Sequence, residues 1–214
     1  MICDAIIFDL DGVLVDSATI AERQLRAWAE HHGIAFAQIV SVYHGRTTAE
    51  TIRVVAPHLD AQREAELLEA SEAADTDGLV AFPGATRLLG SLPGHRWAIA
   101  TSCRRGTAYS RLEHVGLPCP EVLIAAEDVG KGKPAPDAYV LAAARLGVPS
   151  SRCVVIEDAV AGIESARAAG ARIIAVASTS PASALVGADR VARRLDDIQI
   201  DVRSDALIVD CQPM

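Results

Sequence analysis

The chain has 214 residues, of which 50% are hydrophobic and 22% are charged, and its formal net charge at pH 7 is −8. This length and hydrophobic content are sufficient for a packed core, and the low charged fraction argues against an intrinsically disordered chain. Because nucleic-acid backbones are held mainly by basic surface, the acidic excess argues against a nucleic-acid partner. An anionic small molecule would therefore need a local cationic pocket.

The sequence carries no signal for export or for membrane insertion. Asp4 and Asp9 interrupt the first apolar run and no basic leader precedes it, so we expect no signal peptide. No segment approaches about twenty uninterrupted apolar residues. The five cysteines are scattered and include no Cys-x-x-Cys pair, which suits reduced thiols. We expect a cytoplasmic protein with no membrane partner, and the acidic composition is compatible with a monomer.

Short apolar runs with the character of buried strands occur along the chain. They cover residues 5–9, 97–101, 121–125, 153–157 and 172–176. Helical patterns that close with a glycine lie between and after the later runs, at residues 107–116, 136–147 and 158–170. Strands that alternate with helices in this way predict an α/β fold with a doubly wound, Rossmann-like parallel sheet.

Residues 16–82 follow a different pattern, with helical periodicity and no strand-like run. The alternating pattern resumes at Pro83, so we expect a core domain of residues 1–15 and 83–214 and an inserted helical domain of residues 16–82. Both linkers adjoin the carboxyl end of the first strand, where open α/β sheets bind their ligands. Residues 201–214 are expected to add an edge strand or to fray. The helices expected in the insert cover residues 20–33, 48–56 and 61–75.

Carboxylates, a hydroxyl and an ammonium group stand at or near the ends of these predicted strands. Asp9 and Asp11 end the first strand and precede Gly12, so their side chains can project toward one site. The order of groups along the chain resembles the four motifs of the haloacid dehalogenase superfamily. The matching stretches are Asp9-Leu-Asp11-Gly12, Thr101 in WAIATSC, Lys133 in GKGKPAPDAY, and Glu157-Asp158 in VVIEDAVAG.

The resemblance covers nearly the whole chain and implies a haloacid dehalogenase-like core with an inserted helical cap, together with an Mg²⁺ cofactor. It assigns Asp9 as the nucleophile, because a carboxylate can attack phosphorus and form an aspartyl-phosphate. It assigns Asp11 as the general acid for the leaving alkoxide and then as the base that activates water. Lys133 supplies positive charge beside the nucleophile and the phosphate, and the Thr101 hydroxyl holds a phosphoryl oxygen.

Magnesium takes oxygen ligands, and the resemblance assigns these to Asp9, the Asp11 carbonyl and Asp158, with Glu157 completing or orienting the shell. Substrate contacts are expected from two parts of the chain. The amides of Ser102 and Cys103 precede a helix and can bind phosphoryl oxygens. The insert contributes the remaining candidates for substrate binding, which are Ser17, Gly45 and Arg46.

The insert resembles the mobile cap of the β-phosphoglucomutase-like branch, and several stretches are similar to glycerol-phosphate, deoxyglucose-phosphate and bacterial sugar phosphatases. The resemblance therefore implies an Mg²⁺-dependent phosphatase that acts on small sugar- or polyol-phosphate monoesters through an aspartyl-phosphate. This subgroup is expected to have Gly after the Thr-Ser of the second motif, where the chain has Cys103. The geometry of the phosphate loop and the preferred ester stay open.

Two alternatives stay open. A phosphosugar mutase of the β-phosphoglucomutase type is expected to carry a histidine early in the cap, where matching on Asp16-Ser17 places Ala21. A catalytically silent regulator that binds a sugar phosphate would not need Asp9 and Asp11. Dehalogenation requires neither the second aspartate nor Mg²⁺. A phosphonatase would require a cap lysine, and residues 16–82 contain no lysine.

Overall fold

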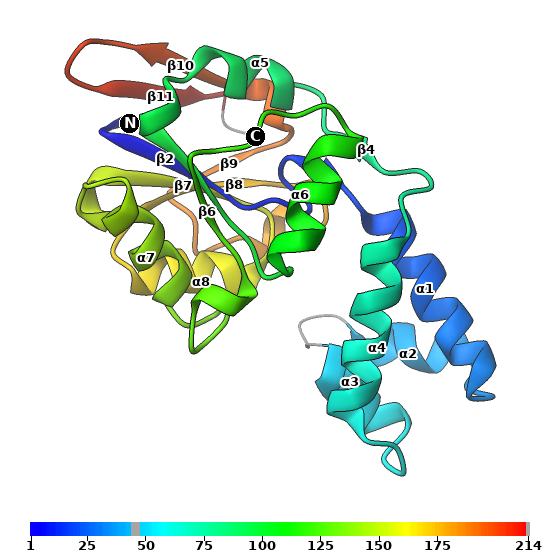
Figure 1. Ribbon diagram of the computed structural model, residues 1–214. Helices are drawn as coiled ribbons and strands as arrows, with labels where there is room; N and C mark the ends of the chain where they lie inside the picture. The colour runs from blue at the N-terminus through cyan, green and yellow to red at the C-terminus, as the bar shows by residue number, and fades with distance from the viewer. Residues whose placement is uncertain (44–47, 213–214) are drawn as a thin grey trace. The chain divides into compact units, whose positions relative to one another are not determined.

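The computed structural model describes residues 1–43 and 48–212 (Figure 1). Its chain contacts separate into two compact units, which are Met1–Asp16 with Val80–Met214, here called the core unit, and Ser17–Leu79, here called the helical unit. Within the described ranges, no helix combines the length and the apolar character that crossing a membrane requires.

The core unit is built on a six-stranded sheet in the order β6-β5-β2-β7-β8-β9, and each neighbouring pair of strands is parallel. The strand order has the first strand at its centre and later strands on both sides, as a doubly wound sheet requires. The α/β fold with a parallel sheet is thus confirmed. The strands are β2 (Ala5–Phe8), β5 (Trp97–Ala100), β6 (Val122–Ile124), β7 (Cys153–Glu157), β8 (Arg172–Val176) and β9 (Arg190–Ala192).

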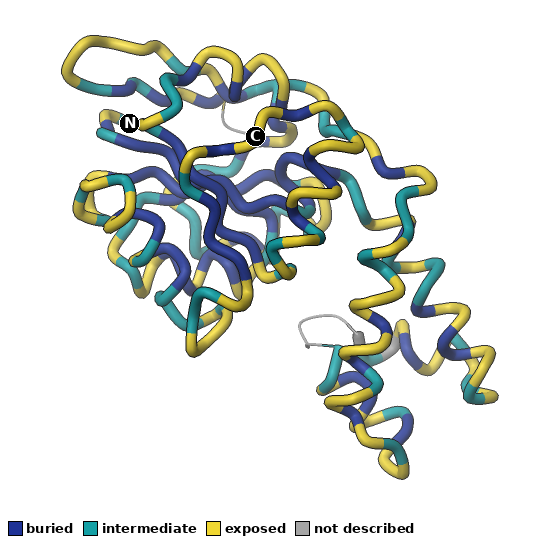
Figure 2. The backbone as a smooth tube through the Cα atoms, viewed as in Figure 1, coloured by how far each residue is buried: buried dark blue, intermediate teal, exposed yellow. Residues whose placement is uncertain are grey.

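Helices pack on this sheet, whose strands are dark in the burial view because both faces are covered (Figure 2). Figure 1 shows α7 (Asp137–Arg145) and α8 (Val160–Ala168) below the sheet and α5 (Ala85–Ser91) above it. The helices α6 (Arg105–His114), α7 and α8 are each followed closely by a glycine with positive φ, namely Gly116, Gly147 and Gly170. Glycine adopts this conformation without the steric penalty that a Cβ would add. Short 3₁₀ helices complete the unit at Gly94–Arg96, Ala126–Asp128, Ser150–Arg152, Ala182–Ala184 and Leu195–Asp197.

The chain ends form a separate antiparallel sheet in the order β1-β11-β10. Its strands are β1 (Ile2–Cys3), β10 (Ile198–Val202) and β11 (Leu207–Cys211). In β11, Leu207, Val209 and Cys211 are buried, with the period of two expected for a half-buried strand. The tail therefore joins a second sheet, and does not add to the edge of the parallel one.

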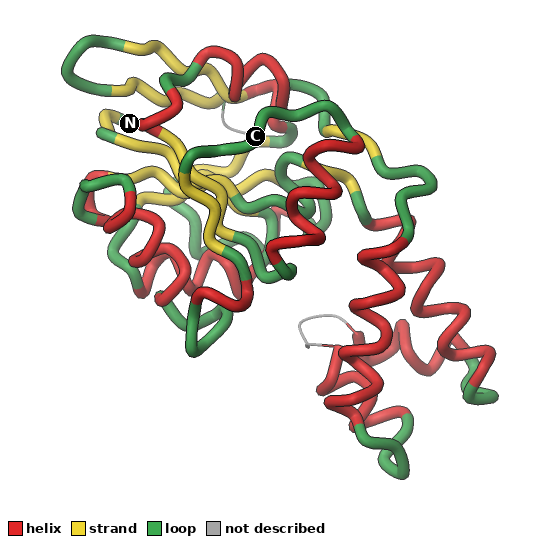
Figure 3. Tube along the Cα trace, in the orientation of Figure 1, coloured by secondary structure: helices red, strands yellow, loops and turns green. Residues whose placement is uncertain are grey.

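A two-stranded antiparallel ladder joins the two linkers of the insert (Figure 3). It pairs β3 (Val15–Asp16) with β4 (Val80–Ala81), and the amide of Phe82 donates to the carbonyl of Leu14 at 2.9 Å. No strand was expected in residues 16–82, because two-residue strands are too short to show a period in the sequence. The ladder therefore joins the two linkers, where the chain leaves the core unit and where it returns to it.

The helical unit contains α1 (Ala18–His31), α2 (Phe36–Tyr43), α3 (Thr48–Val55) and α4 (Ala61–Ala74). Its core is formed by apolar side chains that include Leu25, Trp28, Ile39, Ile52 and Leu68. The helix α2 was not predicted, because its eight residues are mostly apolar and include the β-branched Ile39, Val40 and Val42, which lower helix propensity.

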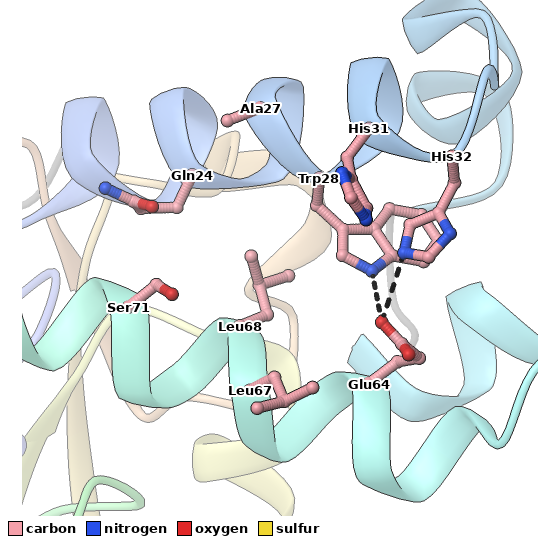
Figure 4. A pocket seen from close by; sticks show the side chains of 9 residues that line it. All are labelled: Gln24, Ala27, Trp28, His31, His32, Glu64, Leu67, Leu68 and Ser71. Carbon is pink, nitrogen blue, oxygen red and sulfur yellow. Dashed lines mark hydrogen bonds and ion pairs between the residues drawn. The ribbon is translucent and has the colours of Figure 1, made fainter.

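A pocket of the helical unit lies between α1 and α4 (Figure 4). Across it, Glu64 Oε2 accepts a hydrogen bond from Trp28 Nε1 at 2.9 Å and lies 3.2 Å from His32 Nε2. The bond from Trp28, with the neighbouring His32, holds the pKa of Glu64 below its ordinary value. Glu64 therefore links α1 to α4 through polar contacts beside the apolar core.

The central strand β2 offers a direct test of the packing. Ile7 is fully buried and is paired with Ala98 and Val155 on the two neighbouring strands. Replacing Ile7→Ala removes buried methyl groups and is expected to lower the free energy of unfolding by about 2–5 kcal/mol in urea denaturation. Ile2→Ala is the matched control, because Ile2 is 63% exposed and should change stability by less than about 0.5 kcal/mol. Equal losses would contradict this assignment of the core.

Candidate active site

Three adjacent strands deliver the main polar groups to one edge of the sheet. Asp9 directly follows β2, Thr101 directly follows β5, and Glu157 ends β7. Because β2 pairs with both β5 and β7 in parallel, the carboxyl ends of these strands meet, as expected for ligand sites in open α/β sheets. Lys133 comes from the loop before α7, and Asp158 follows β7.

Lys133 stands between two carboxylates. Its Nζ lies 2.8 Å from Asp9 Oδ1 and 2.7 Å from Glu157 Oε1, and its side chain is buried. Burial opposes the positive charge, but the attraction of Asp9 and Glu157 outweighs that effect and holds the pKa of Lys133 well above its ordinary value. The structure thus places a permanent positive charge against the carboxylate of Asp9.

Glu157 is fully buried and surrounded by donors. Its Oε1 accepts from Lys133 and from the Tyr139 hydroxyl at 3.0 Å, and its Oε2 accepts from the amides of Asp158 and Ala159 at 2.7 and 2.8 Å. These bonds use the acceptor capacity of a carboxylate and fix its orientation. Burial and the nearby Glu157 charge hold the pKa of Tyr139 well above its ordinary value, so its hydroxyl stays a donor.

Two glycines make room for the acidic groups. A Cβ at Gly162, in the first turn of α8, would lie 1.6 Å from Glu157 Oε1. A Cβ at Gly12 would lie 2.1 Å from Asp158 Oδ2, and Gly12 also has φ +81°. In both places the backbone approaches a buried carboxylate too closely for any side chain. These contacts explain why glycines stand at these two points.

Asp9, Glu157 and Asp158 form an acidic cluster, in which one oxygen of each residue lies within 4.8 Å of the others. When all three are ionised, they exceed the positive charge of Lys133 by two negative charges among the residues described here. Asp158 Oδ1 is buried and has no hydrogen-bond partner in the described part of the chain. Oxygen ligands, excess negative charge and an unsatisfied carboxylate oxygen fit a hard divalent cation, which Asp9 and Asp158 would hold while Glu157, occupied by its four donors, orients the site.

The burial and crowding of these carboxyl groups also raise the pKa values of Asp9 and Asp158. Burial raises the pKa of Asp9 to about 7, with Lys133 acting against the rise and Glu157 adding to it. Burial, followed by the charges of Glu157 and Asp9, raises the pKa of Asp158 to about 8. In the absence of a cation, these carboxyls therefore hold protons at pH values where exposed carboxyls are ionised.

Asp11 faces a different partner. Its Oδ1 forms an ion pair with Arg111 Nη1, which comes from α6. The cluster of three carboxylates that could hold a metal does not include the side chain of Asp11. Sequence reasoning missed Arg111, and it also missed Tyr139 and Thr179, whose hydroxyl donates to Asp158 Oδ2. Only the placement of helices and loops on the sheet reveals these contacts.

The remaining predicted residues lie in the loop after β5 and in the helical unit. Thr101 is buried, and its hydroxyl accepts from the amide of Cys103 at 3.2 Å and donates to the Cys103 sulfur at 3.3 Å. Burial raises the pKa of Cys103 to about 12, so its thiol stays protonated at neutral pH. Ser102 is exposed. Ser17 is at the N-cap of α1, and Gly45 and Arg46 fall outside the described residues.

The raised pKa values predict how stability depends on pH without a cation. A carboxyl whose pKa is higher in the folded state stabilises the fold fully below its unfolded pKa, about 4, and this contribution is lost as pH rises through the folded values of about 7 and 8. Urea unfolding with chelator should therefore show this contribution declining between those limits. Asp158→Asn removes one of the two groups, so the free energy of unfolding of this variant should decline less over the same pH range. Equal declines for both proteins would contradict the assignment.

Comparison with known proteins identifies the family of this chain. Residues 3–170 match the family model of haloacid dehalogenase-like hydrolases. Hexitol phosphatase A of Escherichia coli K12 is 42% identical over 205 residues, which cover 94% of this chain and 95% of that protein. Glycerol-1-phosphate phosphohydrolase 2 of Saccharomyces cerevisiae is 34% identical over 188 residues, or 82% of this chain and 75% of that protein.

Solved structures show the same architecture. The crystal structure of a putative β-phosphoglucomutase from Thermotoga maritima matches with a TM-score of 0.69 and 26% identity, over 91% of this chain and 95% of that one. The resemblance inferred from the four sequence motifs is therefore confirmed. With most of its length matched by the family model, the chain belongs to the haloacid dehalogenase-like hydrolases.

Proposed function

We propose that the protein is an Mg²⁺-dependent phosphatase that hydrolyses small sugar- or polyol-phosphate monoesters. The observation that carries this proposal is the buried Asp9 carboxylate, held 2.8 Å from Lys133 and beside Glu157 and Asp158. Two relatives are named for phosphate esters of a hexitol and of glycerol, which supports the substrate class.

Asp9 acts as the nucleophile. Its ionised carboxylate attacks phosphorus, the bond from phosphorus to the ester oxygen breaks, and an aspartyl-phosphate forms; water then attacks that phosphorus and restores Asp9. Splitting hydrolysis in this way replaces one difficult displacement by two easier ones. Lys133 favours the ionised form of Asp9, because its charge opposes the rise in pKa that burial causes.

A phosphate dianion would be repelled by the acidic cluster without positive charge nearby. Mg²⁺ held by Asp9 and Asp158, with Glu157 orienting the site, would offset that repulsion and stabilise the charge on the phosphoryl oxygens. Lys133 contributes a second positive charge at the same place. Thr101 and the amides of Ser102 and Cys103 are the proposed donors to the phosphoryl oxygens.

Asp11 transfers the protons. It donates a proton to the departing alkoxide and later accepts one from the attacking water, which returns it to its starting form. This role requires a carboxylate that does not serve as a metal ligand. Its ion pair with Arg111 is made by the carboxylate, which is the form that accepts the proton from water. The backbone carbonyl of Asp11 remains the proposed contribution of this residue to the cation.

The helical unit is proposed to be the cap that selects the substrate. Caps of this kind close over small molecules and exclude water from the reaction. Ser17, Gly45 and Arg46 are the proposed contacts to the substrate. A cap of this kind therefore favours small substrates over macromolecular ones.

A phosphosugar mutase is the second candidate, since a putative β-phosphoglucomutase is among the similar structures. The early position on α1 where such a mutase is expected to carry a histidine is Ala21 in this chain. Transfer to water therefore remains the preferred reaction.

A panel of phosphate esters tests the proposal. Phosphate release is measured from hexitol, glycerol, sugar and nucleoside monophosphates, with Mg²⁺ and with chelator. We expect release only with Mg²⁺ and mainly from sugar and polyol esters. Isomerisation of β-glucose 1-phosphate without phosphate release would identify a mutase, and no conversion of any compound would favour a binding-only protein.

The nucleophile has its own test. Asp9→Asn keeps the size of the side chain but removes its nucleophilic carboxylate, so turnover should fall by on the order of 10³-fold or more. Thermal unfolding of the variant should show an intact fold, which separates lost chemistry from lost structure. Turnover that persisted in a folded Asp9→Asn protein would refute the assignment.

A further inference from the structure

Arg111 occupies a core position on α6. Together with Ala108 and Leu112 it forms the buried face of that helix, and only 6% of its surface is exposed. An apolar residue would fit this face, since buried arginine is rare unless it is paired. A charged side chain therefore stands where packing alone would favour a hydrophobic one.

The stability of the fold does not explain why an arginine occupies this buried position on α6. The Nε of Arg111 is buried and has no hydrogen-bond partner among residues 1–43 and 48–212. A guanidinium with an unsatisfied donor loses hydration that one ion pair does not fully replace, and apolar substitutes for buried ion pairs are often as stable or more stable. The reason for Arg111 must lie in what it contacts.

The contact is Asp11, the second aspartate of the first motif. Arg111 Nη1 pairs with Asp11 Oδ1, and the Asp11 side chain keeps 29% exposure against 8% for that of Arg111. The arginine is thus the fixed member of the pair and the aspartate the accessible one. A group that exchanges protons with a substrate and with water needs this combination of a fixed anchor and an open face.

Arg111 and a bound divalent cation would compete for the carboxylate of Asp11. Asp9 is paired with Lys133, on the side where Glu157 and Asp158 gather. Asp11 lies only two positions further along the chain, and a bound divalent cation would attract its carboxylate as well. Arg111 supplies an alternative positive partner, held in place by the packing of α6.

We propose that Arg111 is a positioning residue for Asp11, which it holds away from the acidic cluster and in place for proton transfer to the leaving oxygen. This inference rests on the proposed phosphatase function. The ion pair is made by the carboxylate form of Asp11. Asp11 that was protonated in the preceding turnover gives its proton to the leaving oxygen, an O–H bond forms, and the carboxylate paired with Arg111 remains. The proton that the attacking water later loses returns to that carboxylate.

The test compares leaving groups. An alkoxide needs a proton to depart, whereas 4-nitrophenolate departs without one. Arg111→Gln should therefore lower kcat/KM for an alkyl phosphate such as glycerol phosphate by about 10–100-fold. For 4-nitrophenyl phosphate the same variant should stay within about 3-fold of the wild type, because that ester gains little from general acid catalysis.

Arg152→Gln is the matched control. Arg152 also forms an ion pair with an aspartate, Asp4, but this pair precedes β7 and β2, at the opposite ends of the strands from the site. Arg152→Gln should leave kcat/KM unchanged for both esters. Arg111→Lys retains the charge and should recover part of the loss with glycerol phosphate. If Arg111→Gln does not fold, the lysine variant carries the same comparison with a smaller expected difference between the esters.

A double-mutant cycle shows whether Arg111 acts through Asp11. In an Asp11→Asn background, Arg111→Gln should produce little further loss with glycerol phosphate, because the group that it positions is gone. Equal losses for both esters in a folded Arg111→Gln protein, or full additivity in the cycle, would overturn the inference while leaving the phosphatase proposal standing. Wild-type protein without turnover of any ester would overturn both.

Discussion

The burial of three carboxylates around one ammonium group is the constraint on which this structure depends. Asp9, Glu157 and Asp158 are buried at the ends of adjacent strands, and Lys133 is the one positive charge between Asp9 and Glu157. Such an excess of like charge is unfavourable unless protons or a cation balance it. The neighbouring backbone is shaped to it, with glycines where α8 and the first loop approach the carboxylates. A site of this composition is arranged for a ligand and not for stability.

The two aspartates of the first motif have different partners, and the different roles proposed for them rest on this difference. Asp9 is paired with Lys133 inside the acidic cluster, whereas Asp11 is paired with Arg111 of α6. Identical side chains can serve as nucleophile and as proton carrier when their surroundings differ in this way. Glu157 has a structural role, because four hydrogen-bond donors hold its carboxylate in one orientation and it in turn holds the ammonium of Lys133 in place. The proposed division of roles follows from the element that supplies each partner: the loop before α7 supplies Lys133, and α6 supplies Arg111.

The parallel sheet and the strand-end positions of Asp9, Thr101 and the acidic pair were predictable, because buried strands appear as apolar runs and parallel strands end at one edge. Lys133 lies in the loop before α7 and was expected only from the resemblance to the family. The partners of these residues were not predictable. Arg111 looks like an ordinary helix residue in the sequence, and only the packing of α6 brings it to Asp11. The helix α2 was not predicted because its residues are mostly apolar and partly β-branched, and the strands β3 and β4 were not predicted because two residues are too few to show a period.

Titration calorimetry of the wild-type protein with Mg²⁺ tests most directly whether the acidic cluster is a cation site. The account predicts binding of one cation per chain, and it predicts that Asp158→Asn, which removes the carboxylate with the unsatisfied buried oxygen, greatly weakens that binding. Heat signals that show no binding to the folded wild-type protein, or equal affinity in the Asp158→Asn variant, would contradict the claim that excess buried charge at this edge of the sheet is balanced by a metal ion.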